Sequence, residues 1–486
     1  MKKFVLILKI VIGLYLVLLI PLPEKNQKII KGSEVPFTWN QDELWGNLEL
    51  SFEDAKKITK NELDSIVSKR VINMEDLIVE LENKITTPED SLYQIIETKF
   101  FEITPLIAAQ EKKSTSYIDF YNRVRKKIKL DSYTWDMSSQ TARNTSYRLL
   151  YGMRAAAEEI LLQSSDEDFV STMFVTEEAS ATPSVDVLGI KVHSGDLLVS
   201  RGGAEVSAFI SRGNDYPGNF SHVALVHIDQ ATNQAYFVEA HIEKGVAIAT
   251  LDQYLKDKKL RFMVMRPRAD LPKLIANPML PYEASSYIFN ESQNRHIPYD
   301  FKMDYYDSSA MFCSEVGSYA YKQFGINLWE FKSTISSDGI VRWLNNFGVE
   351  NFVTQMPSDL EYDPVFSVVA EWRNKEILFQ DHLDNAVMDA LISRANNGEQ
   401  LDYNIWTLPL ARIIKAYSLV LNVVDKEGVI PNGMSATMAL KNNAFVDRFQ
   451  NCKSLTASKV DAFKEKNGYL PPYWQLVKMA EECSAN

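Results

Sequence analysis

The sequence has few cysteines, only Cys313, Cys452 and Cys483 among 486 residues. Three thiols are too few for a scaffold held by disulfides, and none of them has the C-x-x-C spacing of a metal site. Positive charge is also scarce, because 64 acidic residues outnumber 52 Lys and Arg and leave a net charge of −12. Such a chain lacks the basic surface with which proteins bind phosphate backbones. The fold must therefore rest on its hydrophobic core, and nucleic acid is not expected as a partner.

Common catalytic and cofactor motifs are absent as well. No H-E-x-x-H, G-x-S-x-G or G-x-G-x-x-G sequence occurs. Gly213 and Gly218 have the spacing of a P-loop, but Asn219 and Phe220 replace the residues that would hold phosphate and magnesium. The six histidines show no spacing that suggests a ligand set: His193, His222, His227, His241, His296 and His382. We therefore expect neither a metal nor a cofactor.

The length and composition predict a folded protein of several domains. At about 150 residues per domain the chain would form about three, and 46% apolar with 24% charged residues is ordinary globular usage. Changes in composition and in hydrophobic periodicity along the chain predict the domain boundaries. We expect a signal anchor or signal peptide at 1–23, a helical domain at 24–163, a linker at 164–187, an α+β domain at 188–345, and a helical region at 346–486.

The first 23 residues predict export. Lys2 and Lys3 precede an apolar run from Phe4 to Leu22, which is interrupted by Lys9. Counted from Phe4, the run approaches the ~20 residues of a transmembrane helix; counted from Ile10, it has the length of a signal peptide's apolar region. We favour the uncleaved anchor, with the lysines on the cytoplasmic side. The expected location is the cell envelope, outside the cytoplasm and anchored in the inner membrane, or secreted or periplasmic if the segment is cleaved.

An oxidising compartment leaves two alternatives for the last two cysteines. Cys452 and Cys483 could pair in a disulfide, or each could be a small buried apolar residue. Both alternatives remain open at this point.

The flanking regions have the apolar spacing of helices. Ser51-Phe52-Glu53-Asp54 has the pattern of a capping box and predicts a helix start there. The apolar segment 408–424 is interrupted by Arg412, Lys415 and Asn422, which predicts a core helix and not a membrane span.

Between residues 188 and 345 the pattern changes to short β-branched and aromatic segments separated by turn residues. Strands are predicted at 195–200, 221–227 and 235–240, and an amphipathic helix from Cys313 to Phe324. A thiol at a helix start is close to free backbone amides and the positive end of the helix dipole, which favour the nucleophilic thiolate. His222 and Glu239 lie in predicted strands, where an ionisable side chain is costly unless it is paired.

A thiolate nucleophile needs an imidazole for proton transfer and a polar group that orients the ring. Cys313, His222 and Glu239 could supply these three parts. Each also has an ordinary structural interpretation: a packed thiol, a hydrogen-bonded core imidazole, and a carboxylate facing solvent.

Five segments resemble a known family when taken in order: Gly195-Asp196-Leu197-Leu198, Ser221-His222-Val223-Ala224-Leu225, Val238-Glu239-Ala240, Tyr299-Asp300-Phe301 and Phe312-Cys313-Ser314-Glu315. They are similar to the YiiX/YebB-like cysteine hydrolases, a circularly permuted branch of the NlpC-type, papain-like fold. The resemblance implies an α+β permuted papain-like domain flanked by helical regions. It further implies that Cys313 is the nucleophile, His222 the base and Glu239 the residue that orients the base, with Tyr299 and Asp300 in the substrate-binding pocket.

We therefore expect a cysteine hydrolase that cleaves amide or ester bonds by acyl transfer, acting on peptide or lipid substrates of the cell envelope. The membrane would be reached through the N-terminal segment. Two alternatives remain: a catalytically idle papain-like domain that acts as an envelope scaffold, and an acyltransferase that uses the same triad.

Overall fold

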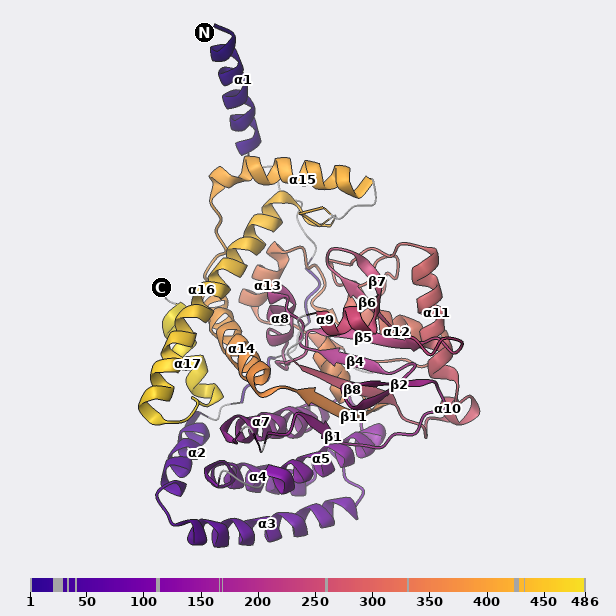
Figure 1. The fold of residues 1–486 in the computed structure, drawn as a ribbon, viewed down its shortest axis with the longest axis vertical. Coiled ribbons are helices and arrows are strands. Elements are labelled where there is room, and N and C mark those ends of the chain that lie inside the picture. Colours follow the sequence, from indigo (N-terminus) through magenta and orange to yellow (C-terminus); the bar gives the residue numbers. More distant parts are fainter. Residues whose placement is uncertain are drawn as a thin grey trace.

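The computed structural model describes residues 2–20, 29–32, 35–39, 42–110, 114–165, 167, 169–257, 261–329, 332–423, 428–431 and 433–484. Helices form both ends of the chain, and a β-sheet lies between them (Figure 1). The chain thus combines helices with an antiparallel sheet, as the resemblance implied.

The main sheet has seven strands in an order that is not the order of the sequence. All neighbouring strands are antiparallel. From one edge to the other they are β1 (Thr172–Phe174), β11 (Phe366–Arg373), β8 (Arg261–Pro267), β4 (Leu197–Ser200), β5 (His222–Ile228), β6 (Ala235–His241) and β7 (Gly245–Thr250). The sheet therefore extends beyond 188–345 in both directions. β1 lies in the segment predicted as a linker, and β11 lies in the region predicted to be helical.

Both faces of the sheet are covered. Leu197 and Val223 belong to one core cluster, and their chain neighbours Leu198 and Ala224 belong to another. Because successive side chains of a strand point to opposite faces, strands covered on both faces are apolar throughout. The first face packs on α11 (Leu280–Asn294) and α12 (Cys313–Gln323), and the second on β2 (Ser184–Val187), β3 (Ile190–His193) and α9 (Leu251–Lys256).

Shorter elements complete this middle region. They are α8 (Glu205–Arg212), α10 (Pro272–Ala276), β9 (Ser333–Thr334), α13 (Asp338–Asn346), β10 (Val353–Thr354) and the 3-10 helix η3 (Pro357–Tyr362). Gly195 has φ +95, and a Cβ there would lie 2.3 Å from Pro281. The Gly195-Asp196 turn thus needs glycine both for its backbone angle and for its close approach to α11.

The N-terminal helices form layers against the sheet (Figure 1). They are α2 (Asp42–Ala55), α3 (Lys60–Glu82), α4 (Ser91–Ala109), α5 (Ser114–Asp131), η1 (Ser132–Thr134), α6 (Gln140–Tyr147), the π-helical η2 (Arg148–Gly152) and α7 (Met153–Gln163). The capping box predicted at Ser51 is wrong, because Ser51 lies inside α2 and its hydroxyl donates to the Asn47 carbonyl at 2.8 Å. The side-chain cap nearest to it along the chain is that of Thr59, which accepts from the Glu62 amide and begins α3.

The C-terminal region is helical, with α14 (Lys375–Asn396), η4 (Ile405–Thr407), α15 (Leu408–Val423), α16 (Ala436–Asn467) and α17 (Tyr473–Ser484). Cys452 and Cys483 are free and buried, and the Cys452 thiol donates to the Ala480 carbonyl at 3.4 Å. Of the two alternatives for these cysteines, the structure has the one without a disulfide. The prediction that 408–424 is a core helix is wrong, because α15 lies at one end of the molecule with much of its surface exposed.

Buried ion pairs join the N-terminal helices to the sheet and to α14. Arg125 pairs with Glu371 on β11, and Glu158 pairs with Arg261 on β8. Arg261 also pairs with Asp381 on α14. These side chains are all at most 3% exposed. Removing one partner of such a pair leaves an uncompensated buried charge, which costs about 3–5 kcal/mol.

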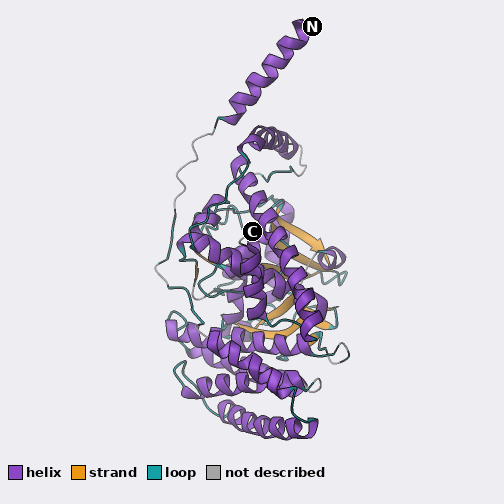
Figure 2. Cartoon of the chain, turned by 90° about the vertical axis from the view of Figure 1, so that its left-hand side faces the viewer, coloured by secondary structure: helices purple, strands orange, loops and turns teal. Residues whose placement is uncertain are grey.

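The first helix, α1 (Lys2–Leu19), lies at the end of the molecule that carries α15 and projects away from the rest of the chain (Figures 1 and 2). No helix within the described residues is both long and apolar enough to cross a membrane. The transmembrane helix expected within 1–23 is therefore not found: α1 has 18 residues, about 27 Å at 1.5 Å per residue, and contains Lys3 and Lys9. Met1 and residues 21–23 lie outside the described part of the chain.

Candidate active site

Cys313 is the first residue of α12. The helix start is fixed by the Phe312 amide, which donates to the Glu315 side-chain oxygen Oε2 at 2.8 Å. Just before it, Met311 forms a bridge with Tyr299, so the loop that carries Tyr299 lies beside the helix start. The Cys313 sulfur lies 3.9 Å from the Ser221 carbonyl oxygen, immediately before β5. The thiol thus sits where a helix N-terminus meets the end of the sheet.

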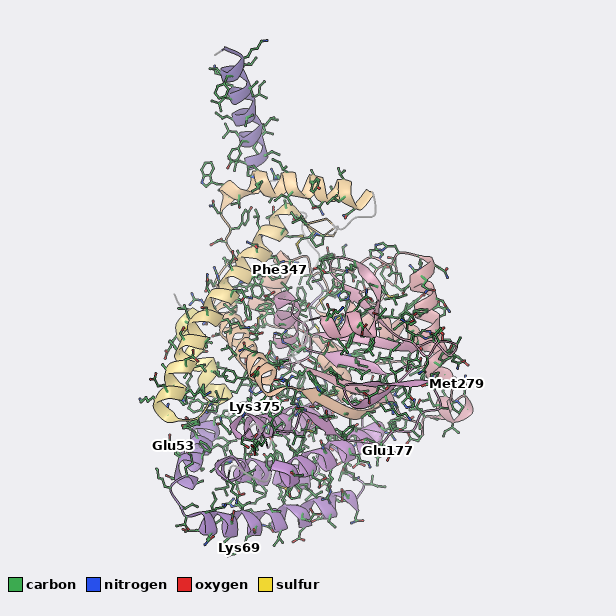
Figure 3. The ribbon with its side chains drawn as sticks, viewed as in Figure 1. Glu53, Lys69, Glu177, Met279, Phe347 and Lys375 are labelled. Atoms are coloured by element: carbon green, nitrogen blue, oxygen red, sulfur yellow. The ribbon has the colours of Figure 1, made fainter. Side chains whose placement is uncertain are left out.

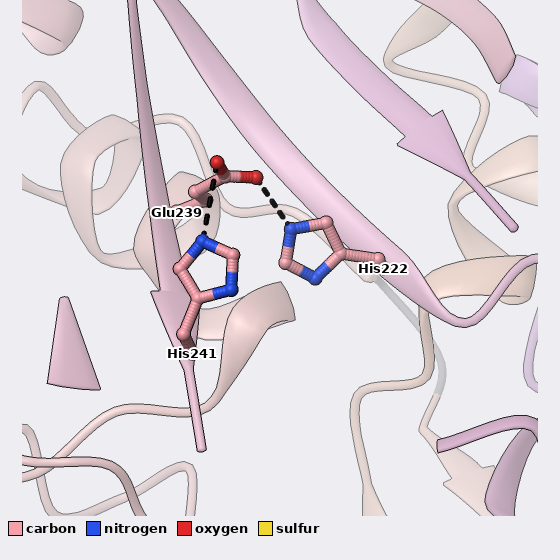
Figure 4. Close-up of side chains that lie close together, drawn as sticks. All are labelled: His222, Glu239 and His241. Carbon is pink, nitrogen blue, oxygen red and sulfur yellow. Dashed lines mark hydrogen bonds and ion pairs between the residues drawn. The ribbon is translucent and has the colours of Figure 1, made fainter. Parts of the chain in front are cut away.

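The sheet register brings His222 and Glu239 together. Ala224 pairs with Glu239 across β5 and β6, and residues two apart on a strand share a face. His222 and His241 therefore lie on the same face as Glu239, at the end of the sheet where β5 begins and β6 ends. His222 Nε2 donates to Glu239 Oε2 at 2.7 Å, and His241 Nε2 lies 3.2 Å from Oε1 (Figure 4). The buried carboxylate, 1% exposed, is held between two imidazoles.

The thiol joins this pair through the same imidazole. The Cys313 side chain lies close enough to His222 to act on the charge of the ring. Because Nε2 is occupied by Glu239, Nδ1 is the nitrogen available to the sulfur. Burial disfavours a charged ring, but the hydrogen bonds to Cys313 and Glu239 outweigh it and raise the pKa of His222 to about 10. Burial also acts against a charged Glu239, yet His222 and His241 hold the pKa of its carboxyl well below its usual range. The ring is therefore an imidazolium and Glu239 a carboxylate at neutral pH.

A second carboxyl near the thiol has the opposite protonation state. Burial raises the pKa of Glu315 to about 9, and the nearby charges of Asp300, Asp304 and Cys313 act in the same direction. Glu315 is therefore neutral at pH 7. It can cap α12 without placing a full negative charge beside the sulfur.

A cavity of about 300 Å³ opens at Cys313. Tyr299 and Asp300 both line it, as do Ser221 and residues of α8. Most of its other lining is apolar: Phe301, Met303, Phe312, Phe347, Val349, Met356, Val429 and Met434. The structure thus places all five predicted site residues together: His222 and Glu239 form a hydrogen-bonded pair beside Cys313, and Tyr299 and Asp300 line the cavity that Cys313 also lines. Their catalytic and binding roles stay predictions.

Asp300 has a structural task that the sequence did not reveal. Its carboxylate accepts hydrogen bonds from the Lys302 amide at 2.8 Å and the Asp304 amide at 2.5 Å. Both oxygens therefore organise the loop that forms the cavity wall. Asp300 thus shapes the cavity wall by holding the backbone amides of Lys302 and Asp304.

Residues 191–364 match a family model. The model describes the C92 family, Peptidase_C92, as permuted papain-like amidase enzymes of the YaeF/YiiX type. The resemblance predicted from five short segments is confirmed over this part of the chain. No curated protein and no solved structure matches the chain.

The C92 match supports a cysteine hydrolase in its broad class, on a permuted papain-like domain. The matched segment contains every predicted site residue and most of the sheet. It also reaches 19 residues past the predicted boundary at 345, in agreement with the continuation of the fold toward β11.

His241 is a site residue that the sequence analysis missed. It was set aside as one of six scattered histidines, although its position two residues after Glu239 on a predicted strand put it on the same face. The ligand atoms of His222, Glu239 and His241 lie within 4.8 Å of one another, and this set could hold a metal ion. Two imidazoles and a carboxylate are a ligand set that suits Zn²⁺. Such an ion would draw on the same His222 and Glu239 side chains, so it would compete with the arrangement described above.

Proposed function

We propose that the chain is a cysteine hydrolase that cleaves an amide or ester bond by acyl transfer through Cys313, His222 and Glu239. The observation that carries the proposal is the meeting of a thiol at a helix start with an imidazole that is hydrogen-bonded to a buried carboxylate: Cys313 interacts with His222, and His222 donates to Glu239 at 2.7 Å. A structural core histidine would need only one such partner. Here the two partners are a potential nucleophile and a carboxylate, and an open cavity begins at the sulfur.

In the first step, the Cys313 thiolate attacks the carbonyl carbon of the substrate and a C–S bond forms. The negative charge that develops on the carbonyl oxygen lies at the N-terminus of α12, where the first amides have no intrahelical acceptor. As the intermediate collapses, the C–N or C–O bond breaks. The Nδ1 proton of the His222 imidazolium passes to the leaving nitrogen or oxygen, which departs as amine or alcohol.

In the second step, neutral His222 takes a proton from water at Nδ1 as the water oxygen attacks the thioester carbon. The C–S bond breaks, the acid is released, and the thiolate and imidazolium are restored. Glu239 touches neither the substrate nor the sulfur. Its contribution is to fix the ring orientation through Nε2 and to stabilise the positive charge that the ring carries.

The proposal includes a cell-envelope location, with a peptide-derived or lipid-derived substrate. The apolar lining of the cavity supports a substrate whose acyl part is not charged.

The test uses the three free thiols of the same chain. Cys313, Cys452 and Cys483 are all buried, at 8%, 2% and 4% exposure, so exposure alone distinguishes them little. Burial raises the pKa of Cys452 to about 11, which makes it a matched internal control. Iodoacetamide at neutral pH should label Cys313 at least about tenfold faster than the other two, and His222→Ala should abolish this preference. Equal, slow labelling of all three thiols would instead favour an idle scaffold.

Turnover requires a second measurement, because a reactive thiol is not yet an enzyme. Cys313→Ser should retain the fold by circular dichroism and lose hydrolysis of amide or ester substrates by about 1,000-fold or more, since a hydroxyl is not ionised in this site. Mass spectrometry of the products then separates water from another acceptor. An acyl group found on an added amine or alcohol, and not as free acid, would identify an acyltransferase.

A further inference from the structure

Helix α15 presents an apolar stripe that nothing in the described chain covers. Leu410, Ile413, Tyr417 and Val420 are 60%, 57%, 58% and 63% exposed. Their spacing of three, four and three residues places them on one side of the helix. Trp406, 63% exposed, extends the same stripe by one turn. Soluble proteins rarely leave a row of large apolar side chains open to water, so such a stripe indicates a binding surface.

The charges of this helix lie away from the stripe. Arg412 donates to the Leu18 and Ile20 carbonyls at 2.7 and 2.8 Å, and Lys415 donates to the Pro431 carbonyl at 2.7 Å. No Asp or Glu occurs between residues 403 and 424. The segment is thus amphipathic, with basic and aromatic but no acidic residues. This is the composition of helices that lie in the interface of a lipid bilayer.

Helix α1 adds a second apolar surface at the same end of the molecule. Tyr15 donates to the Trp406 carbonyl at 2.7 Å, which joins α1 to the start of α15. Large side chains are exposed along α1 from Phe4, at 71%, to Val17, at 61%. The side chains of α1 and of the outer side of α15 project away from the rest of the chain (Figure 3).

The segment after α15 connects this surface to the cysteine. The Ile430 amide donates to the Ser418 hydroxyl of α15 at 3.0 Å, and Pro431 accepts from Lys415. Val429, Pro431 and Met434 of the same segment line the cavity that contains Cys313. This segment therefore contacts α15 on the side opposite the stripe and also forms part of the cavity wall.

We propose that α15, together with α1, rests on a lipid surface and that the cavity receives a lipid acyl group from that side. The proposal builds on the hydrolase proposed above and specifies its substrate class as an acyl lipid, bound through an amide or ester. A lipid surface is favoured over a protein partner for two reasons. The apolar area continues over two helices that lie in different directions (Figure 1), and neither α1 nor α15 contains an Asp or Glu that could pair with a basic group of a protein partner. In the reaction, the lipid acyl group would pass from the headgroup nitrogen or oxygen to the Cys313 sulfur, and the headgroup would leave as an amine or alcohol. Water would then release the acyl group as the free acid.

The binding test uses the full chain and vesicles of phosphatidylcholine, with or without phosphatidylglycerol, in a flotation assay. Ile413→Glu places a carboxylate in the middle of the stripe. The matched control is Ile72→Glu on α3, where Ile72 is 63% exposed at the opposite end of the molecule. We expect Ile413→Glu to weaken partitioning about tenfold or more, and Ile72→Glu to leave it unchanged. An unchanged partition coefficient in Ile413→Glu, an equal loss in both variants, or a wild-type chain that does not float would overturn the proposal.

A second readout separates this surface from the triad. Iodoacetamide labelling of Cys313 in solution should be the same in Ile413→Glu and wild type, because the stripe does not touch the thiol. Hydrolysis of a long-chain acyl ester embedded in vesicles should fall about tenfold in Ile413→Glu, while hydrolysis of a short soluble ester should not change. Equal rates on the embedded ester would overturn the lipid route. Failure of Cys313 to label in the wild type would refute the proposed hydrolase. The flotation assay would still decide separately whether α15 and α1 bind lipid.

Discussion

Replacing Glu239 by Gln tests how the site keeps His222 charged. The amide oxygen can still accept from Nε2, so the ring orientation is retained, but the negative charge 2.7 Å away is lost. An opposite charge at such a distance shifts a pKa by about 1–3 units. We therefore expect the pKa of His222 to fall from about 10 to about 8. A shift of two units corresponds to about 2.7 kcal/mol between the two protonation states.

The consequence can be measured as a pH profile. At pH 9 an imidazole with a pKa of 10 is about 90% protonated, and one with a pKa of 8 is about 10% protonated. The alkaline limb of kcat/KM for a fluorogenic amide should therefore move down by about two pH units in Glu239→Gln, and its value at pH 9 should fall about tenfold. The contribution of His222 to the free energy of unfolding also decreases as the pH rises. Because its folded pKa is raised above 6.5, this contribution is complete below pH 6.5 and is lost as the pH rises through about 10.

Glu361→Gln is the matched control. Glu361 is also 1% exposed, but its carboxylate pairs with Arg154 and not with the site. This variant should lower the free energy of unfolding without moving the alkaline limb. An alkaline limb that stays near pH 10 in Glu239→Gln would refute the assignment of Glu239 as the residue that sets the charge of His222.

Three further predictions concern the surroundings of the triad. The pKa of Glu315 in the folded protein is about 9, so its contribution to stability declines as the pH rises from 4.5. We therefore expect Glu315→Gln to raise the free energy of unfolding, measured by urea titration, by about 2 kcal/mol at pH 7 and by little at pH 4. A variant that is no more stable at pH 7 would contradict this. Asp300→Ala should raise KM more than it lowers kcat, because it loosens the cavity wall; a pure kcat effect would argue against it. Added Zn²⁺ should inhibit hydrolysis by occupying His222, Glu239 and His241, and His241→Asn should weaken inhibition about tenfold; equal inhibition of both proteins would exclude this site.

The proximity of Cys313, His222 and Glu239 could be predicted from the sequence, whereas their catalytic roles stay predictions. An ionisable residue inside an apolar strand, or a thiol at a helix start, departs from the residue types that local structure favours. Such departures are concentrated at functional sites. The alternation of β5 and β6 then placed His222 and Glu239 on one face. His241 follows from the same alternation, but a search for ligand spacing along the sequence does not reveal residues that meet across strands.

The boundaries and flanks were harder to predict for physical reasons. β11 joins the sheet from about 100 residues after β8, and no local pattern specifies a pairing at that separation. Ser51 has a capping pattern, yet α2 continues through it because the helix packs on α4, with Leu44 and Leu48 partly buried against the core cluster. α15 has the apolarity of a core helix, and sequence alone does not show that no element covers its outer side.

The ion pairs between layers have a practical consequence for the design of fragments. A truncated protein covering only 188–345 would contain Arg261 but neither Glu158 nor Asp381. The guanidinium on β8 would therefore lose both of its counterions, and the sheet would be exposed to water. The truncated protein would also lack β1 and β11, leaving β8 as an open edge able to pair with another molecule. Aggregation of such a fragment would result from the missing neighbours and would say nothing about the candidate site. Biochemical work on the thiol is therefore best begun with helices and sheet kept in one polypeptide.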